Sequence, residues 1–191
     1  AYDLYQKKNN FILAGMLWQK MRNKTMGTAI DLCGLGLDKI EETEEAFRIG
    51  AYVSLRDLET DEALNTYTGG AFRESVRHIV GVQFRNVATV GGSIWGRFGF
   101  SDVMTIFRAL GAKVELYHAG MMDLNDFVKL SRKTRDILVA VIVPKNVKGV
   151  VYVSQRNQST DFPVLTCAVA KRADGYAAAI GATPHLAEVV V

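Results

Sequence analysis

Two glycine-containing turns hold the residues best suited to chemistry, and that chemistry is the binding of an anion. The first turn is Ala14-Gly15, at the end of the apolar run 11–14, and the second is the segment 88–93, Ala-Thr-Val-Gly-Gly-Ser. Glycine accepts a positive φ and has no side chain, so the backbone amides of such turns can approach a phosphate closely. The alternative is that both segments are tight turns of a β-rich fold, and spacing alone leaves the two interpretations open.

The sequence gives little support for a catalytic residue or a metal site. We see no Ser–His–Asp or Cys–His arrangement, and the isolated His78, His118 and His185 favour surface or structural roles. Cys33 and Cys167 are far apart and have no Cys or His neighbours, so this chain by itself ligates neither zinc nor an iron–sulfur cluster. We therefore predict no catalytic residue and no metal ligand, and we expect both cysteines to be buried free thiols.

The composition places the chain among soluble globular proteins. Hydrophobic residues make up 49% and charged residues 23% of its 191 positions, and the net charge of +3 is too small to favour nucleic acid. No apolar run approaches the roughly 20 residues of a membrane span, and no signal peptide is visible. We expect a cytoplasmic protein. The chain lacks an initiator Met, and residues 1–8 read like the second half of a helix, so we expect a fragment.

The pattern of apolar runs predicts an α+β fold of two adjacent subdomains. Residues 1–53 form the smaller one, with helix-forming residues at 16–21 and four short strands, expected at 11–14, 29–32, 39–42 and 47–50. Residues 54–181 form the larger one, which begins at a helix cap made by Ser54 and Asp57. Its further elements are helices at 71–80 and 103–110 and strands at 112–117, 137–143, 150–153, 164–170 and 176–180. A Rossmann site at Gly34 and Gly36 is disfavoured, because Lys39 stands in place of the third glycine.

The run Arg-Asn-Val-Ala-Thr-Val-Gly-Gly-Ser-Ile at 85–94, followed by Asp102, resembles a motif of one known family. That family is the FAD-binding (medium) subunit of molybdenum hydroxylases, which include xanthine dehydrogenase and carbon monoxide dehydrogenase. Segments 49–51, 110–116 and 155–163 match as well, so the resemblance covers nearly the whole chain. It implies a two-subdomain FAD-binding fold of the vanillyl-alcohol oxidase or molybdopterin dehydrogenase type.

The resemblance also implies a set of cofactor contacts. The second turn would line the diphosphate and ribityl chain of FAD, and Asp102 would accept hydrogen bonds at the adenosine end, unless it only caps a helix after Ser101. Arg156 and Asp161 would form a structural pair at the rim of the site. Trp95 would lie near the cofactor or in the core. The predicted cofactor-binding residues are Ala14, Gly15, Ala88, Thr89, Gly91, Gly92, Ser93, Asp102, Arg156 and Asp161.

The chain departs from the family pattern at two places. The first phosphate loop of the family reads Ala-Gly-Gly-Thr-Asp-Leu, whereas Ala14-Gly15 is followed here by Met16-Leu17, two residues fewer. Either these residues are lost and FAD binding is weakened, or a loop segment is missing from the sequence as printed; we expect the latter. The family also continues into a further domain, so we expect 182–191 to be the start of a missing C-terminal domain.

For function, the resemblance implies an electron-transfer subunit. Electrons would leave a substrate at a molybdopterin-binding large subunit, cross iron–sulfur clusters on a small subunit, and pass through FAD to NAD or another acceptor. The alternatives are a scaffold subunit that kept the fold and lost the cofactor, and a stand-alone flavin oxidoreductase. The basic cluster at 129–135 is either a solvated loop or a docking site for an acidic partner surface.

Overall fold

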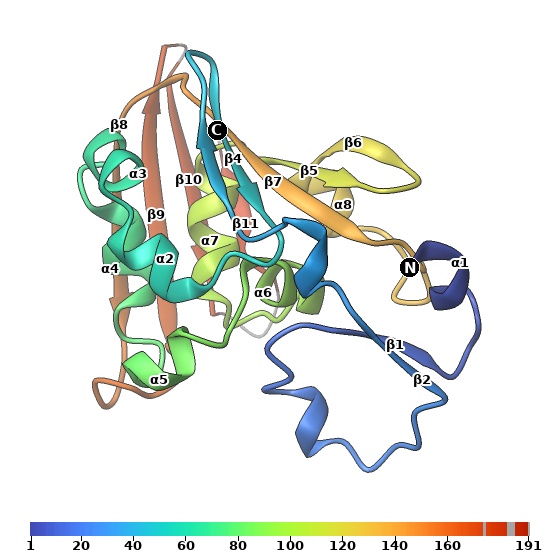
Figure 1. The fold of residues 1–191 in the computed structure, drawn as a ribbon. Helices are drawn as coiled ribbons and strands as arrows, with labels where there is room; N and C mark the ends of the chain where they lie inside the picture. Colours follow the sequence, from blue (N-terminus) through green and yellow to red (C-terminus); the bar gives the residue numbers. More distant parts are fainter. Residues whose placement is uncertain (174, 183–185, 191) are drawn as a thin grey trace.

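The computed structural model of the protein describes residues 1–173, 175–182 and 186–190, and it confirms the α+β class. Three separate sheets are joined by short helices (Figure 1). Of the predicted C-terminal segment 182–191, residues 183–185 and 191 lie outside the described residues, and so does the prediction for His185. Within those ranges, no helix has the length and apolar character needed to cross a membrane.

The N-terminal part is built on a two-stranded parallel sheet. Strand β1 (Asn10–Leu13) pairs with β2 (Thr28–Asp31), and α1 (Tyr2–Tyr5) lies against them. In Figure 1 this pair lies apart from the other sheets. Its connection contains one 3-10 turn, η1 (Gln19–Met21), instead of the longer helix predicted at 16–21.

A second 3-10 turn, η2 (Cys33–Leu35), follows β2. It carries Cys33 at the surface, so the expectation of two buried thiols is wrong for this residue. Cys167 is half-buried, and both cysteines are free. The reason is local, because Leu32 is buried in a cluster with Ile30 and Ile137 while the next residue, Cys33, is left exposed.

The second sheet has five antiparallel strands in the order β3-β4-β7-β5-β6. Their bounds are β3 (Ile40–Glu42), β4 (Ala46–Gly50), β5 (Lys113–Leu116), β6 (Gly120–Asp123) and β7 (Leu138–Pro144). Strand β4 pairs with β7, with Phe47 opposite Val143 and Ile49 opposite Val141. These four side chains are fully buried. The proposed subdomain division at residues 53 and 54 stays a prediction, and this ladder crosses it.

The third sheet is antiparallel in the order β11-β10-β9-β8. Its strands are β8 (Val147–Gln155), β9 (Leu165–Arg172), β10 (Tyr176–Gly181) and β11 (Glu188–Val190). Helix α7 (Asp102–Ala109) packs against β9 and β10 on the face that buries Tyr152, Ala168 and Ala179. A hydrogen bond of 2.9 Å between the hydroxyls of Thr105 and Thr166 joins α7 to β9. This packing fixes the N-terminus of α7, which carries Asp102.

The remaining helices are short and cover the sheets. They are α2 (Leu55–Thr60), α3 (Glu62–Tyr67), α4 (Ala71–Val76), α5 (Val82–Arg85), α6 (Val90–Gly96) and α8 (Leu124–Phe127). Ser54 and Asp57 form the predicted capping box at the start of α2. Helix α4 is shorter than predicted but carries Phe72, whose ring meets the Phe107 ring of α7 edge-on at 5.0 Å. Helix α6 was not predicted, since its sequence is rich in glycine.

Candidate functional site

One cavity of about 940 Å³ brings the predicted site residues together, and we call it the main cavity. It is bounded by the turn after β1, by the segment from α5 to the start of α7, and by residues after β8. All ten predicted cofactor-binding residues line it. Its volume lies at the upper end of the roughly 300–1,000 Å³ typical of small-molecule sites.

The two glycine turns are in direct contact. A Cβ added to Gly15 would lie 2.0 Å from the carbonyl oxygen of Val87, so only glycine fits at this point. The chain then turns through Met16, whose φ of 57° is a left-handed conformation that favours glycine. Among the described residues, none accepts a hydrogen bond from the amides of Gly15, Met16 or Leu17. The first turn therefore has unbonded backbone donors on residues that line the main cavity.

The second turn is held more tightly by its own bonds. The Gly91 amide donates to the Ala51 carbonyl at 2.8 Å, and a Cβ on Gly91 would lie 2.6 Å from that oxygen. The Thr89 hydroxyl accepts from the Gly92 amide at 3.1 Å and so caps α6, while the Ser93 hydroxyl donates to the Thr89 carbonyl. Gly91 thus allows the backbone of the turn to pack closely against Ala51. The Thr89 hydroxyl only accepts in these bonds, so its proton is available for another acceptor.

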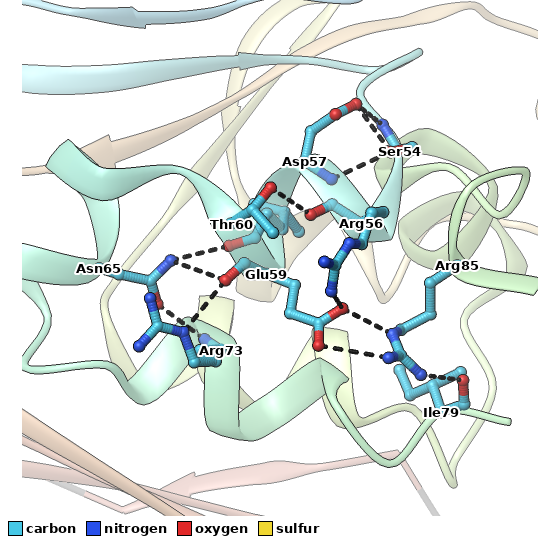
Figure 2. Close-up of polar contacts among 10 residues, drawn as sticks. Ser54, Arg56, Asp57, Glu59, Thr60, Asn65, Arg73, Ile79 and Arg85 are labelled. Carbon is cyan, nitrogen blue, oxygen red and sulfur yellow. Dashed lines mark hydrogen bonds and ion pairs between the residues drawn. The ribbon is translucent and has the colours of Figure 1, made fainter. Parts of the chain in front are cut away.

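A buried ion pair fixes the approach to the second turn (Figure 2). Arg85 at the end of α5 donates to both carboxylate oxygens of Glu59 in α2, at 2.8 and 3.2 Å, and Arg56 contacts Glu59 at 2.9 Å. Burial alone would raise the pKa of Glu59, but the bonds from Arg85 and Arg56 outweigh it and lower the pKa. Because the Leu55 amide also bonds the Ala88 carbonyl at 2.8 Å, helix α2 holds the turn in place.

A second buried pair forms another wall of the main cavity. The Asp102 carboxylate pairs with the Arg156 guanidinium and also accepts a hydrogen bond of 2.5 Å from the Tyr152 hydroxyl. Both contacts use the same oxygen, Oδ1. Burial raises the pKa of Asp102, and the Tyr152 hydroxyl and the Arg156 charge oppose that rise. Burial likewise raises the pKa of Tyr152.

These contacts refine two of the sequence-based expectations. Arg156 bonds the main-chain carbonyl of Asp161 at 2.5 Å, whereas its carboxylate partner is Asp102. The Asp161 carboxylate accepts from the Gln158 amide at 3.1 Å and so shapes the loop after β8. The cap of α7 is Ser101, whose hydroxyl accepts from the Met104 amide. Tyr152 was missed because a tyrosine in an alternating strand reads as a core residue.

Four aromatic side chains gather in the wall of the main cavity, and we call them the aromatic cluster: Trp18, Phe98, Phe100 and Phe162. The Trp18 ring lies 5.2 Å from Phe98 and 6.1 Å from Phe162, and Phe100 lies 4.4 Å from Phe162. Phe162 is 60% and Trp18 39% exposed, so flat apolar surface faces the cavity. Trp95 packs on Phe127 at 5.6 Å and also lines the cavity, and a position of Trp95 near the cofactor stays a prediction.

The cavity suits a ligand with anionic and planar parts. The free amides of the first turn and the Thr89 hydroxyl are donors for an anion, and the aromatic cluster offers stacking surface. Three buried polar atoms of lining residues, Gln19 Oε1, Arg97 Nε and Arg156 Nε, have no hydrogen-bond partner among the described residues. A polar ligand would satisfy them. No group of three or more His, Cys, Asp or Glu side chains suited to a metal ion occurs in this part of the chain. FAD, with a diphosphate between two ring systems, fits this combination.

Comparison with known proteins agrees with this geometry. Residues 6–146 match the model of a family described as the FAD binding domain in molybdopterin dehydrogenase. Xanthine dehydrogenase/oxidase of Gallus gallus is 26% identical over 150 residues, which is 69% of this chain and 11% of that protein. The chain thus spans a small part of the length of this relative.

Solved structures share the fold. Quinoline 2-oxidoreductase from Pseudomonas putida 86 is 20% identical with a TM-score of 0.86, and the match covers 98% of this chain and 71% of that one. Carbon monoxide dehydrogenase from Hydrogenophaga pseudoflava is 21% identical with a TM-score of 0.85, over 98% of this chain and 74% of that one. The family match covers both turns, both buried ion-pair carboxylates and most of the aromatic cluster. The chain therefore belongs to the FAD-binding domain family of the molybdopterin dehydrogenases, a family of oxidoreductases, and its cofactor is FAD.

Proposed function

We propose that this domain holds FAD within a multi-subunit molybdenum hydroxylase. Electrons would enter from iron–sulfur clusters on a small subunit, after oxidation of a substrate at a molybdopterin-binding large subunit, and leave to NAD or another acceptor. Membership of the family supports the assignment, and so do relatives named as dehydrogenases and oxidoreductases. FAD supplies the redox chemistry when bound, and the residues of the chain supply position and electrostatics.

The observation that carries this proposal is the convergence of both glycine turns on the main cavity. We place the diphosphate there, with the amides of Gly15, Met16 and Leu17 and the Thr89 hydroxyl as donors. The predicted site residues Ala14, Ala88, Gly91, Gly92 and Ser93 shape the same part of the wall. Donors that lie unbonded on lining residues would not have to break an internal hydrogen bond to meet a charged group, which favours binding.

The other two features of the cavity orient the rest of the cofactor. We place one ring system of FAD against the aromatic cluster, where stacking removes apolar surface from water. Asp102 would then accept a hydrogen bond from the cofactor through Oδ2, because Oδ1 already serves Tyr152 and Arg156. Burial raises the pKa of Asp102, and the Arg156 charge opposes that rise and so favours the ionised form, in which that oxygen is an acceptor. Asp161 holds the loop that carries Phe162.

The scaffold alternative loses its main support in this arrangement. It rested on the two residues that the first turn lacks, yet the shortened turn still carries amides that no described residue bonds. The stand-alone oxidoreductase would need a substrate site next to the cofactor.

Electron transfer is tested in the assembled complex. The large and small subunits would be combined with either the wild-type chain or a Gly15→Ala chain, and the bleaching of the flavin band would be followed after substrate is added. We expect bleaching, and reduction of NAD or a dye acceptor, with the wild-type chain and loss of both with the variant. Equal acceptor reduction by a complex whose variant chain carries no FAD would refute the route, while leaving FAD binding itself untouched.

A further inference from the structure

A second cavity of about 540 Å³ lies beside the main cavity, and we call it the arginine cavity. Its lining residues are Arg97, Gly99, Arg108, Arg132, Leu186, Ala187 and Glu188. Arg97 and Arg132 line both cavities, whereas Arg108 and Glu188 line only this one. The two sites are therefore neighbours that can be altered separately.

Arg97 is the feature that calls for a ligand. It is 3% exposed and follows α6 with a left-handed φ of 47°, a conformation that costs energy for a residue other than glycine. Its guanidinium donates to the Leu130 carbonyl at 2.6 Å and lies 5.3 Å from the centre of the Phe127 ring. Its Nε is buried and has no hydrogen-bond partner among the described residues. Burying a cation without an anionic partner is unfavourable, so the site is incomplete as it stands.

The neighbouring arginines add positive charge, which nearby carboxylates offset only in part. Burial lowers the pKa of Arg108, and the charges of Asp123 and Glu188 oppose this effect. Arg132 donates to the carbonyls of Gly96 and Arg97, at 2.6 and 2.8 Å, and so holds the end of α6. Arg108 uses its Nε for the Asn125 side chain at 2.8 Å, which leaves its two Nη groups without an acceptor in the described residues. Burial and the charge of Arg132 lower the pKa of Arg97. Within the described ranges, no ion pair includes any of the three arginines.

The burial of Arg97 decides what kind of anion can reach it. The basic segment 129–135 lies at the surface and is open to an acidic protein face. Arg97 lines the arginine cavity and is 3% exposed, so a small ligand that enters the cavity is better able to meet it than an extended protein surface is. Guanidinium groups present paired N–H donors that match the oxygens of a phosphate. The volume exceeds what a phosphate alone needs, and Glu188 in the wall can accept hydrogen bonds from hydroxyl groups.

We propose that the arginine cavity binds the phosphate group of a small phosphorylated molecule, independently of the FAD in the main cavity. Arg97 and Arg108 would bind the phosphate oxygens, Arg132 would hold the backbone beneath them, and Glu188 would face the remainder of the ligand. The proposal does not rest on the electron-transfer route.

The test is a calorimetric titration with inorganic phosphate at constant ionic strength, made with and without FAD. Arg108→Gln removes a donor that lines only this cavity. Arg77→Gln is the matched control, because Arg77 is exposed, pairs with Glu74 and lines neither cavity. We expect saturable binding that Arg108→Gln weakens by about tenfold or more and Arg77→Gln leaves unchanged, with equal FAD content in all three proteins.

A second variant distinguishes a direct loss of phosphate binding in Arg108→Gln from a loss caused by misfolding. Glu188→Gln removes the carboxylate of the cavity, so phosphate should bind more tightly than in the wild type, a gain that unfolding cannot imitate. Equal phosphate affinity of Arg108→Gln and Arg77→Gln would overturn the proposal. So would binding that FAD abolishes, since the phosphate would then occupy the main cavity. A heat signal that chloride reproduces would identify ionic screening and would also overturn it.

Discussion

Gly15 lies directly against the backbone of Val87, so closely that a Cβ at position 15 would fall 2.0 Å from the Val87 carbonyl oxygen. This contact joins the turn after β1 to the segment that leads into α6. The two turns are far apart in the sequence, and each by itself is an ordinary loop. Together they bring the unbonded amides of the first turn and the Thr89 hydroxyl to the wall of the main cavity. We expect FAD binding to depend on this contact.

Replacing Gly15 with alanine should separate the two turns. The added methyl group cannot be accommodated against a backbone carbonyl, so we expect a loss of about 1–3 kcal/mol in the free energy of unfolding, as for other overpacked positions. The dissociation constant for FAD should rise by about tenfold or more. Chemical denaturation and FAD titration measure the two effects. Gly34→Ala is the control, because nothing lies within 4 Å of its added Cβ. Equal FAD affinity of the two variants would contradict the role of the contact.

The Glu59–Arg85 pair should make stability depend on acid pH. The bonds from Arg85 and Arg56 lower the pKa of Glu59. The contribution of Glu59 is therefore complete above the unfolded pKa of about 4.3 and is lost as the pH falls through the lowered folded pKa. Glu59→Gln breaks a buried pair, so it should reduce the free energy of unfolding at pH 7 by about 3 kcal/mol and flatten its dependence on pH in that window.

Glu62→Gln is the matched control for this prediction, since Glu62 is exposed in the next helix and forms no ion pair within the described residues. Its unfolding curve should follow the wild type at every pH. If Glu59→Gln showed the wild-type slope between pH 3 and 5, the pair would not be the source of the acid sensitivity.

Arg156→Gln should destabilise the protein at neutral pH more than at acid pH. Without Arg156, the buried Asp102 carboxylate loses its counter-charge, which costs about 3–5 kcal/mol. Burial already raises the pKa of Asp102, and the loss of Arg156 raises it further. As the pH falls, Asp102 takes up a proton, and the deficit relative to the wild type should shrink. Denaturation at several pH values measures it, with Lys148→Gln on the exposed side of β8 as control. A deficit that stayed constant with pH would argue against an ionised pair.

The aromatic cluster should contribute to FAD affinity through stacking. Trp18→Leu keeps an apolar side chain but removes the ring, so we expect the dissociation constant for FAD to rise about threefold to tenfold, with little change in the unfolding curve. The flavin fluorescence of the bound cofactor should also increase, because a stacked aromatic ring is removed. Tyr176→Leu, an exposed aromatic residue outside the main cavity, is the control. Unchanged affinity and fluorescence in Trp18→Leu would place both FAD rings elsewhere.

The sequence was informative wherever local pattern decides the structure. Alternating or apolar runs predicted the strands β1 to β5 and β7 to β10. Ser54 with Asp57 predicted the start of a helix. Helix α6 was not predicted from the sequence, because glycine and serine are weak helix formers. It forms because Thr89 caps it and because Val90 and Ile94 are fully buried, which are tertiary effects.

The lining of the main cavity was partly predictable as a set of residues but not as an arrangement. The ten predicted residues line one cavity, and six of them belong to one long motif, the run 85–94 with Asp102. The Arg156–Asp102 pair was not anticipated, because the nearer Asp161 in the sequence offers only its carbonyl in the fold. Similarly, the aromatic cluster joins residues from three separate segments. Such pairings depend on chain topology, which a linear pattern does not contain.

We propose that the main cavity, where Gly15 meets Val87, holds the FAD of this domain. The most direct test is an equilibrium titration of the purified, cofactor-free chain with FAD, followed by flavin absorbance and made in parallel with Gly15→Ala and Gly34→Ala. We expect saturation at one FAD per chain for the wild type and Gly34→Ala, and strongly weakened uptake by Gly15→Ala. A wild-type chain that takes up no FAD, or a Gly15→Ala chain that binds it as well as the wild type, would show that FAD is not held in this way.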